Sequence, residues 1–249
     1  MSGSYENPHV APQITLYTFP DCPYCQRIHI LLTELKLPFE EVFIDINKPR
    51  EQWYLDINPR GLVPSLALAF SNTLLTHEIL TESSVIAQFI CDSRPSHVLP
   101  SPTSSPTAPL RRARVQLYVD AFMGKLGSQS RAVLLAEDPE AKVRELVEGV
   151  RGDVEPLLKG CGEGEGPFLG GEGTLSLAEI LTAPFLLRFY ALSSRGILPK
   201  SFKQGLEALP HFGPWAEAVI AHPSVKENWD EESVVQRAEA MLAKVKAEA

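Results

Sequence analysis

Two cysteines, Cys22 and Cys25, stand where a predicted strand is followed by a predicted helix, and this junction constrains the fold most. Residues 14–18 (ITLYT) form a β-branched and aromatic run that favours a strand. After a proline-containing turn, apolar residues recur at helical spacing, at Ile28, Leu31, Leu32 and Leu35. Cys22 is therefore predicted at or just before the start of a helix, with Pro23 in the first helical position, where a missing N–H costs no hydrogen bond.

The following residues extend this pattern to a complete order of elements. Residues 39–45 (FEEVFID) predict a second strand, and 49–57 a short helix opened by Pro49. The runs LVPSLALAF and TLLTHEI predict a hairpin. A helix is expected over 82–92, with one apolar side formed by Val85, Ile86, Phe89 and Ile90. The order β-α-β-α-β-β-α within about 80 residues is that of the thioredoxin-like fold.

The second half of the chain is expected to be entirely helical. Leu110–Leu126 and Pro139–Leu158 have helical spacing, and Ser176 with Glu179 has the spacing of a capping box that opens another helix. The charged C-terminal stretch, acidic first and basic last, matches the dipole of a solvated helix. The glycine-rich residues 160–173 favour a connecting loop over a phosphate cradle, since no strand precedes them and no Lys-Ser/Thr follows.

These patterns predict an α/β thioredoxin-like domain followed by an all-α domain. The expected bounds are a flexible tail at 1–12, the thioredoxin-like domain at 13–93, a linker at 94–109 and the helical domain at 110–249. The linker is inferred from five prolines among serines and threonines between Ser93 and Pro109, which offer little to bury.

Composition narrows the classes of function. The net charge of −8 argues against binding nucleic acid or an anionic membrane surface, both of which need clustered Lys and Arg. No apolar run approaches the length of about 18 residues that a membrane span needs. The polar N-terminus does not resemble a secretory signal, and four cysteines are too few for a disulfide scaffold. We therefore expect a reducing, cytoplasmic setting.

Cys22 is the candidate reactive residue. Unpaired N–H groups at a helix start stabilise a thiolate, and cysteines in such positions have pKa values of roughly 3.5 to 7.5. Half of a zinc site and a structural pair of buried thiols are the alternatives. No metal is expected, because Cys91 and Cys161 are isolated and no paired histidines follow. Cys25 either resolves a disulfide or faces the helix interior, whereas Cys91 is expected in the core and Cys161 in an exposed loop.

Four strings in this order, YTFPDCPYCQR, NKP, NPRGLVPSL and ESSVIAQFI, resemble the glutathione transferase family. The similarity is greatest to its omega class and to fungal omega-like members, and it extends from about residue 14 to residue 92. Residues 176–179 (SLAE) resemble the capping motif of the family's helical domain, with Glu179 where aspartate is usual. The Cys-Pro-Tyr-Cys form also resembles glutaredoxin, which points to thiol exchange.

The resemblance implies a glutathione site on the N-terminal domain. The backbone of Val63 would pair with the cysteinyl part of glutathione, and the following Pro64 would be cis. Glu82 and Ser83 would hold the γ-glutamyl end, although the same pair also fits an ordinary helix cap. Phe19, beside the cysteine turn, completes the contacts expected from this region.

The contact with the glycine carboxylate is implied for Lys48 in the NKP string. This chain has two more residues than the omega pattern between Lys48 and the Val-Pro step, so Arg50 is an alternative.

The implied activity is that of a glutathione-dependent thiol transferase, with a mixed disulfide between Cys22 and glutathione as its intermediate. Conjugation of glutathione to an electrophile is the first alternative, and a non-catalytic binding or scaffold protein is the second. A small hydrophobic or thiol/disulfide substrate is expected between the domains, above Phe19 and Pro20. It would lie against the first helix of the helical half, near Arg112, Arg114, Tyr118 and Phe122, unless that helix face is core. The resemblance also implies a homodimer.

Overall fold

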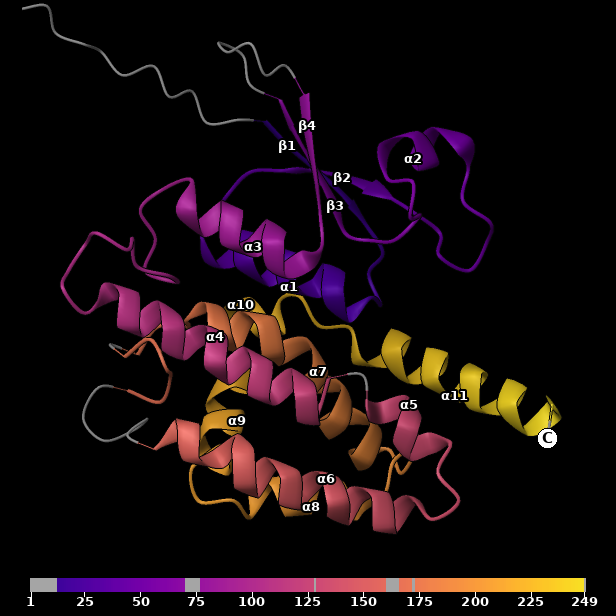
Figure 1. Ribbon diagram of the computed structural model, residues 1–249. Coiled ribbons are helices and arrows are strands. Elements are labelled where there is room, and N and C mark those ends of the chain that lie inside the picture. Colours follow the sequence, from indigo (N-terminus) through magenta and orange to yellow (C-terminus); the bar gives the residue numbers. More distant parts are fainter. Residues whose placement is uncertain (1–12, 70–76, 128, 160–165, 172, 249) are drawn as a thin grey trace, which may run out of the picture.

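The computed structural model describes residues 13–69, 77–127, 129–159, 166–171 and 173–248. In these residues an N-terminal sheet with flanking helices is followed by helices alone, and the two parts lie against each other (Figure 1). The expected tail at 1–12 and Cys161 lie outside the described residues.

The N-terminal part contains a mixed four-stranded sheet in the order β2-β1-β3-β4. Strand β1 pairs parallel to β2 and antiparallel to β3, and β3 pairs antiparallel to β4 as the predicted hairpin requires. The strands are β1 (Gln13–Thr18), β2 (Glu40–Phe43), β3 (Ser65–Ala69) and β4 (His77–Thr81). Side chains alternate along β3, so Leu66 and Leu68 are buried on the face that receives helices.

Three helices complete this part and confirm the thioredoxin-like order. They are α1 (Pro23–Glu34), α2 (Gln52–Ile57) and α3 (Ser83–Asp92). Helices α1 and α3 contact each other and lie between the sheet and the helical part, whereas α2 lies on the opposite side of the sheet (Figure 1). The predicted apolar side of α3 is correct for Ile86 and Ile90 but wrong for Val85, which is 52% exposed.

Helix α2 begins three residues later than Pro49 predicts. The guanidinium group of Arg50 donates hydrogen bonds to the backbone carbonyls of Asp45, Ile46, Lys48 and Gly61. These bonds hold the preceding residues in a loop, so Glu51, with extended backbone, becomes the N-cap.

The second part is helical throughout the described residues. Its elements are α4 (Ala108–Lys125), α5 (Gln129–Leu134), α6 (Pro139–Asp153), the 3₁₀ helix η1 (Glu155–Leu158), α7 (Leu177–Ser194), α8 (Lys200–Glu207), α9 (Phe212–Ala221), α10 (Pro223–Lys226) and α11 (Glu231–Glu248). Within the predicted linker, Val98 and Leu99 are buried, and the Val98 carbonyl accepts a hydrogen bond from the N–H of Leu177. The division into domains stays a prediction.

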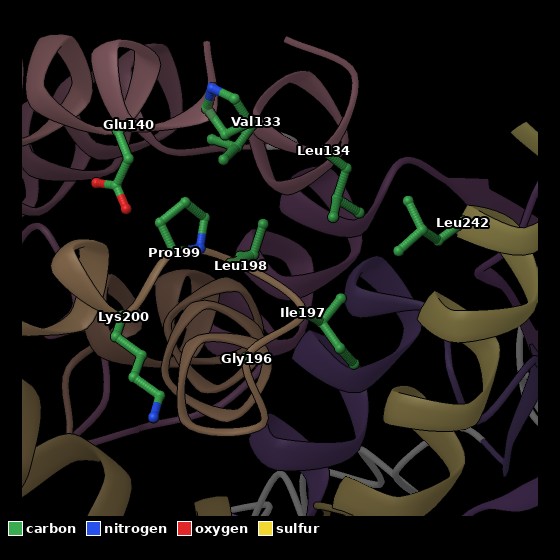
Figure 2. Close-up of a pocket in the computed structure, with 10 residues that line it drawn as sticks. Val133, Leu134, Glu140, Gly196, Ile197, Leu198, Pro199, Lys200 and Leu242 are labelled. Carbon is green, nitrogen blue, oxygen red and sulfur yellow. The ribbon is translucent and has the colours of Figure 1, made fainter. Parts of the chain in front are cut away.

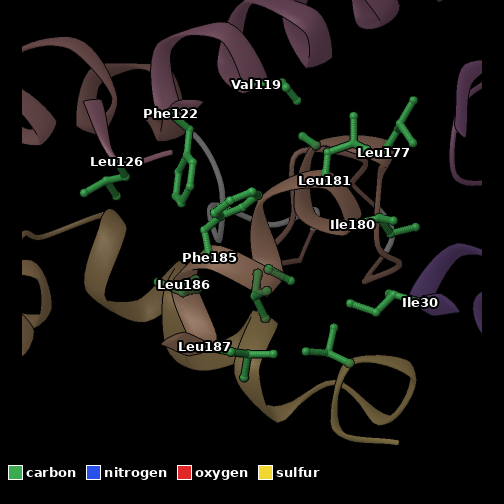
Figure 3. Close-up of a cluster of buried hydrophobic side chains, with 14 of the residues drawn as sticks. Ile30, Val119, Phe122, Leu126, Leu177, Ile180, Leu181, Phe185, Leu186 and Leu187 are labelled. Carbon is green, nitrogen blue, oxygen red and sulfur yellow. The ribbon is translucent and has the colours of Figure 1, made fainter. Parts of the chain in front are cut away.

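Helix α7 is the centre of the core. All but two of its 18 residues are buried, as expected of a helix that is apolar on every side. It packs against α1, α4, α8, α9 and α11. Figure 3 shows Ile180 of α7 beside Ile30 of α1, and Phe185 of α7 near Phe122 of α4. The apolar core is thus continuous between the two parts of the chain.

The predicted capping box at the start of α7 is confirmed. The Ser176 hydroxyl accepts a hydrogen bond from the N–H of Ala178, and the Glu179 carboxylate accepts one from the N–H of Ser176. Glu179 is fully buried and also accepts from the Leu169 N–H and the Trp215 indole, at 2.9 and 3.0 Å. One carboxylate therefore fixes the start of α7 and ties it to α9. No helix in the described ranges combines the length and apolarity that crossing a bilayer needs.

Candidate functional site

Cys22 is the N-cap residue of α1, as its position in the sequence predicts. Its backbone is extended (φ −81°, ψ 118°), and Pro23 occupies the first helical position. The Cys22 N–H donates to the carbonyl of Phe19 and its own carbonyl accepts from Gln26, both at 3.0 Å. The side chain is half-buried, and its Sγ lies 3.9 Å from the carbonyl oxygen of Val63.

The surroundings of Cys22 favour its thiolate. The pKa of Cys22 is lowered to about 6, first by a hydrogen bond from the Cys25 thiol. Burial opposes this shift, whereas the backbone N–H groups of Cys25 and Tyr24 and the charge of Arg188 add to it. At pH 7 a thiol with this pKa is about nine-tenths thiolate.

Cys25 is fully buried beneath Cys22. Burial, followed by the hydrogen bond and the charge of Cys22, raises the pKa of Cys25 far above its usual value. Cys25 is therefore a protonated thiol that donates to its neighbour and faces the interior, which was one of the two alternatives. Both cysteines are free thiols, as is Cys91, which lies in the core as expected.

A cavity of about 280 Å³ brings together four of the predicted glutathione contacts. Its walls come from the start of α1, the loop before β3, and the junction of β4 with α3. The lining residues are Tyr24, Asn58, Leu62, Val63, Pro64, Thr81, Glu82 and Ser83. Because Val63 both lines this cavity and contacts the Cys22 sulfur, the thiol lies at the cavity's edge.

The Val63–Pro64 peptide bond is cis. The preceding carbonyl, that of Leu62, accepts hydrogen bonds from the Tyr54 hydroxyl at 2.5 Å and the Asn58 amide at 2.9 Å. In the described part of the chain, no backbone group hydrogen-bonds to the N–H or carbonyl of Val63. The turn is thus held by its neighbours, while Val63 lines the cavity and its backbone groups are left out of the protein's backbone hydrogen bonds in this region.

Glu82 and Ser83 lie at the start of α3. Glu82 has a left-handed backbone (φ 68°), a conformation that costs a non-glycine residue of order 1–3 kcal/mol and is frequent at functional sites. Its exposed carboxylate contacts the guanidinium of Arg60. Ser83 is buried, and its hydroxyl accepts a hydrogen bond of 3.1 Å from Arg27.

The other predicted contacts lie outside this cavity's lining. The Lys48 side chain is 78% exposed and pairs with Asp45 at 3.1 Å. The alternative, Arg50, has its guanidinium committed to four backbone carbonyls and is not free to meet a carboxylate. Phe19 is buried, and its ring contacts the ring of Phe43 and the guanidinium of Arg237.

Two buried arginines next to Cys22 were missed by sequence reasoning. Arg27 donates to the Leu181 carbonyl and to Ser83, and its guanidinium stacks over the Phe185 ring at 4.9 Å. Arg188 donates to the side chain of Gln26 and to the carbonyls of Pro184 and Asp21. Among the described residues neither arginine forms an ion pair with a carboxylate.

A detectable signal existed for Arg188. It is the one basic residue in the apolar run that forms α7, and a charge buried there must meet polar partners. Burial lowers the pKa of Arg188 to about 10, with the Cys22 charge acting in the opposite direction, so the guanidinium remains charged.

Four residues of α4 were expected near the second substrate, and none of them lines the cavities beside the cysteine turn; the alternative, that this helix face is core, holds for Tyr118 and Phe122. Tyr118 and Phe122 are fully buried and pack against Trp215, and Arg112 binds Asp92 and the Pro100 carbonyl. Arg114 lines a different cavity, next to Phe168. The orientation of α4 against α7 and α9 turns this face into core.

A larger cavity, of about 730 Å³, also adjoins the cysteine turn. Asp21 and Pro23, which flank Cys22, line it together with residues from α5, α7 and α11. A further cavity of about 530 Å³ lies between α5, α6, α11 and the α7–α8 turn, and Figure 2 shows Leu134, Ile197 and Leu242 around it. No residue of the cysteine turn lines this last cavity. In the described residues, no three His, Cys, Asp or Glu side chains are placed to hold a metal ion.

Known proteins resemble this chain over most of its length. Residues 16–98 match the family model described as glutathione S-transferase, N-terminal domain. The chain is 26% identical over 221 residues to pyrimidodiazepine synthase of Drosophila melanogaster, covering 85% of this chain and 79% of that one. It is also 26% identical to glutathione S-transferase omega-1 of Mus musculus, with 85% and 78% covered.

The fold matches solved structures equally broadly. Glutathione transferase Omega 2C of Trametes versicolor superposes with a TM-score of 0.77 at 26% identity, covering 94% of this chain and all of that one. A rice glutathione transferase solved in complex with glutathione gives a TM-score of 0.75 at 26% identity, with 94% and 97% covered.

Proposed function

The chain belongs to the glutathione S-transferase family and has omega-class relatives, and from this premise we propose that it is a glutathione-dependent thiol transferase acting through Cys22. The observation that carries the proposal is the half-buried Cys22 sulfur, with a pKa lowered to about 6, at the edge of a cavity. Thiol exchange needs a thiolate, and an attacking thiol works best when its pKa is near the ambient pH.

In the first step the Cys22 thiolate attacks the glutathionyl sulfur of a mixed disulfide, R–S–SG. The Cys22–SG bond forms while the R–S bond to that sulfur breaks, and R–S⁻ leaves and takes a proton from water. In the second step the thiolate of a second glutathione attacks the glutathionyl sulfur on Cys22. Oxidised glutathione is released and the Cys22 thiolate returns, so electrons balance without another reductant. The low pKa of Cys22 favours this step, since the thiolate of a more acidic thiol leaves faster.

Glutathione is proposed to occupy the cavity beside Cys22. The N–H and carbonyl of Val63 form no backbone hydrogen bond among the described residues, and they would pair with the cysteinyl unit in the manner of an added strand. The carbonyl would then leave its 3.9 Å contact with the Cys22 sulfur. Ser83 and the N-terminus of α3 would bind the γ-glutamyl carboxylate. Glu82 would bind the γ-glutamyl ammonium group, which would replace Arg60 as the partner of its carboxylate. Lys48 and Phe19 stay predicted contacts.

Conjugation is the second candidate, and the large cavity beside Asp21 and Pro23 favours it because a small molecule could meet glutathione there. Bound glutathione would then be the nucleophile and Cys22 a bystander. A non-catalytic binding role is the third candidate.

Three other expectations also stay predictions: a homodimer, a cytoplasmic setting, and the domain bounds 13–93, 94–109 and 110–249. Light scattering would test the homodimer.

The deciding experiment replaces Cys22 by serine and by alanine. We expect both variants to lose turnover of a glutathionyl mixed disulfide while they keep binding glutathione in calorimetry. Cys91→Ala, which removes a buried thiol remote from both cavities, is the control. Retained thiol transfer in Cys22→Ala would refute the mechanism. If both Cys22 variants turn over an aromatic halide as fast as the wild type does, the result would support conjugation. If the wild type binds glutathione but turns over neither substrate, the result would support the non-catalytic role.

A further inference from the structure

The large cavity beside the cysteine turn is cationic, although the chain as a whole is acidic. Four basic side chains line it, those of Arg131, Arg188, Arg237 and Lys244, against a single acidic one, Asp21. The whole chain has 23 basic and 31 acidic residues. We call this cavity, between α5, α7, α11 and the start of α1, the cationic cleft. A local excess of one charge in a concave site concentrates ligands of the opposite charge.

Within the described residues, the positive charges of the cleft are only partly balanced, by the charges of Cys22 and Asp21 that act on Arg188. None of the four basic residues forms an ion pair among the described residues. The Asp21 carboxylate accepts a hydrogen bond from the Ser233 hydroxyl at 2.8 Å. The guanidinium of Arg237, stacked on Phe19, lies near enough to Arg188 to lower the pKa of Arg188 further. Like charges held together in this way are relieved by an anion between them.

The cleft also has an apolar wall. Val234, Arg237, Met241 and Lys244 recur at intervals of three and four residues, so α11 presents one mixed face to the cleft. Leu192 of α7 and Leu134 of α5 line the cleft as well, and Leu192 is buried. Leu134 is shared with the neighbouring apolar cavity, where Figure 2 shows it across from Leu242. A ligand that fills the cleft therefore needs an apolar body as well as a negative charge.

We propose that the cationic cleft binds the group R of the mixed disulfide R–S–SG, and that R is an amphipathic organic anion with a carboxylate on an apolar body. This inference rests on the proposed function, because it names the class of second substrate. Asp21 and Pro23, the neighbours of Cys22 in the sequence, line the cleft, and Val63, whose carbonyl oxygen lies 3.9 Å from the Cys22 sulfur, lines the other cavity. With the glutathionyl part in one cavity and R in the other, the Cys22 sulfur attacks the glutathionyl sulfur, and R–S⁻ leaves from the far side of that sulfur into the cleft.

The test compares a charged substrate with its neutral counterpart. The charged probe is the mixed disulfide of glutathione with 4-mercaptophenylacetic acid. The neutral counterpart is the same mixed disulfide with the carboxyl group of the phenylacetic acid converted to its methyl ester. For the wild type we expect kcat/KM to be about tenfold higher for the acid, since a tenfold preference needs only about 1.4 kcal/mol. Added salt should reduce the preference. Equal rates for acid and ester would overturn the proposal.

The variants remove charge from the cleft without touching Cys22. Arg131→Gln combined with Lys244→Gln changes two exposed residues, and we expect it to lower kcat/KM for the acid several-fold and for the ester less than twofold. Lys200→Gln removes the same kind of charge from the neighbouring cavity and should change neither rate. Arg237→Gln should act as the double variant does, with thermal unfolding as the check on its contact with Phe19. Equal losses for acid and ester would show that the cleft does not select for charge.

A binding measurement separates this inference from the proposed function. Calorimetry of Cys22→Ser with 4-(methylthio)phenylacetate needs no catalysis. Binding that is weakened in the charge variants and unaffected by saturating glutathione supports the inference, even if thiol transfer proves independent of Cys22. Competition with glutathione would show that the cleft belongs to the tripeptide and would overturn the inference, as would an absence of binding.

Discussion

Replacing Cys25 by alanine should raise the pKa of Cys22 from about 6 to roughly 7. The Cys25 thiol is the largest cause of the lowered value, and a hydrogen bond to a charged group contributes about 1.5–3 kcal/mol. A thiol is a weak donor, so the lower end applies, and one pKa unit corresponds to about 1.4 kcal/mol. The backbone N–H groups and Arg188 remain, which keeps the pKa below its ordinary value of 9.0.

The matched variant is Cys25→Ser, whose hydroxyl still donates at the same position. We expect its Cys22 pKa to stay within about half a unit of the wild type, because the donor is kept. The assay is the pH dependence of alkylation by iodoacetamide, with the modified residue identified by mass spectrometry and buried Cys91 as the internal unreactive thiol. An unchanged midpoint in Cys25→Ala would refute the role of the hydrogen bond. Equal midpoints in the alanine and serine variants would attribute the shift to packing instead.

Three further predictions concern stability and binding. The pKa of Cys22 in the folded state lies below its ordinary value, so the thiolate stabilises the fold fully above about pH 9, and this contribution is lost as the pH falls through about 6. In urea titrations, the free energy of unfolding of the wild type should therefore rise by up to a few kcal/mol relative to that of Cys22→Ser as the pH increases across that window. Glu179→Gln should cost about 2–4 kcal/mol in the same assay, because the amide keeps one acceptor oxygen and turns an NH2 donor toward the other of the buried Ser176 and Trp215 donors. The exposed Glu217→Gln should cost little. Arg27→Lys should raise the KM for glutathione several-fold with little change in kcat, because the Ser83 hydroxyl loses the hydrogen bond that Arg27 donates to it. Equal changes in KM and kcat would contradict the role of Arg27 in positioning Ser83.

Local signals in the sequence predicted the elements that local interactions determine. The Cys22 N-cap, Pro23 at the first helical position and the Ser176–Glu179 box each depend on residues within one turn, and all three are confirmed. The order of strands and helices follows in the same way from apolar periodicity. The start of α2 was missed because Arg50 binds carbonyls up to 11 residues away, a set of contacts that periodicity does not encode.

The environment of the site could not be predicted because its contacts connect distant parts of the chain. Arg27 reaches a carbonyl 154 residues away, and Arg188 reaches the side chain of Gln26, 162 residues away. Tyr118 and Phe122 were expected near a substrate unless their helix face is core, because helical spacing gives an apolar face without saying what covers it. The packing of α4 on α7 and α9 decided that this face is core.

The same long contacts connect the acidity of the thiol to the packing of the two parts of the chain. Cys22 and Cys25 lie at the start of α1, while Arg188 lies on α7, which is the helix that α1 packs against. The guanidinium that helps to lower the pKa of Cys22 is held by Gln26 and by the Asp21 carbonyl, both beside the cysteine turn. A helix start and a Cys-x-x-Cys spacing are therefore only part of the cause. The remainder comes from a buried cation of the helical part, and that cation also lines the cationic cleft. A change that loosens α1 from α7 should thus weaken both the thiolate and the binding of an anion beside it.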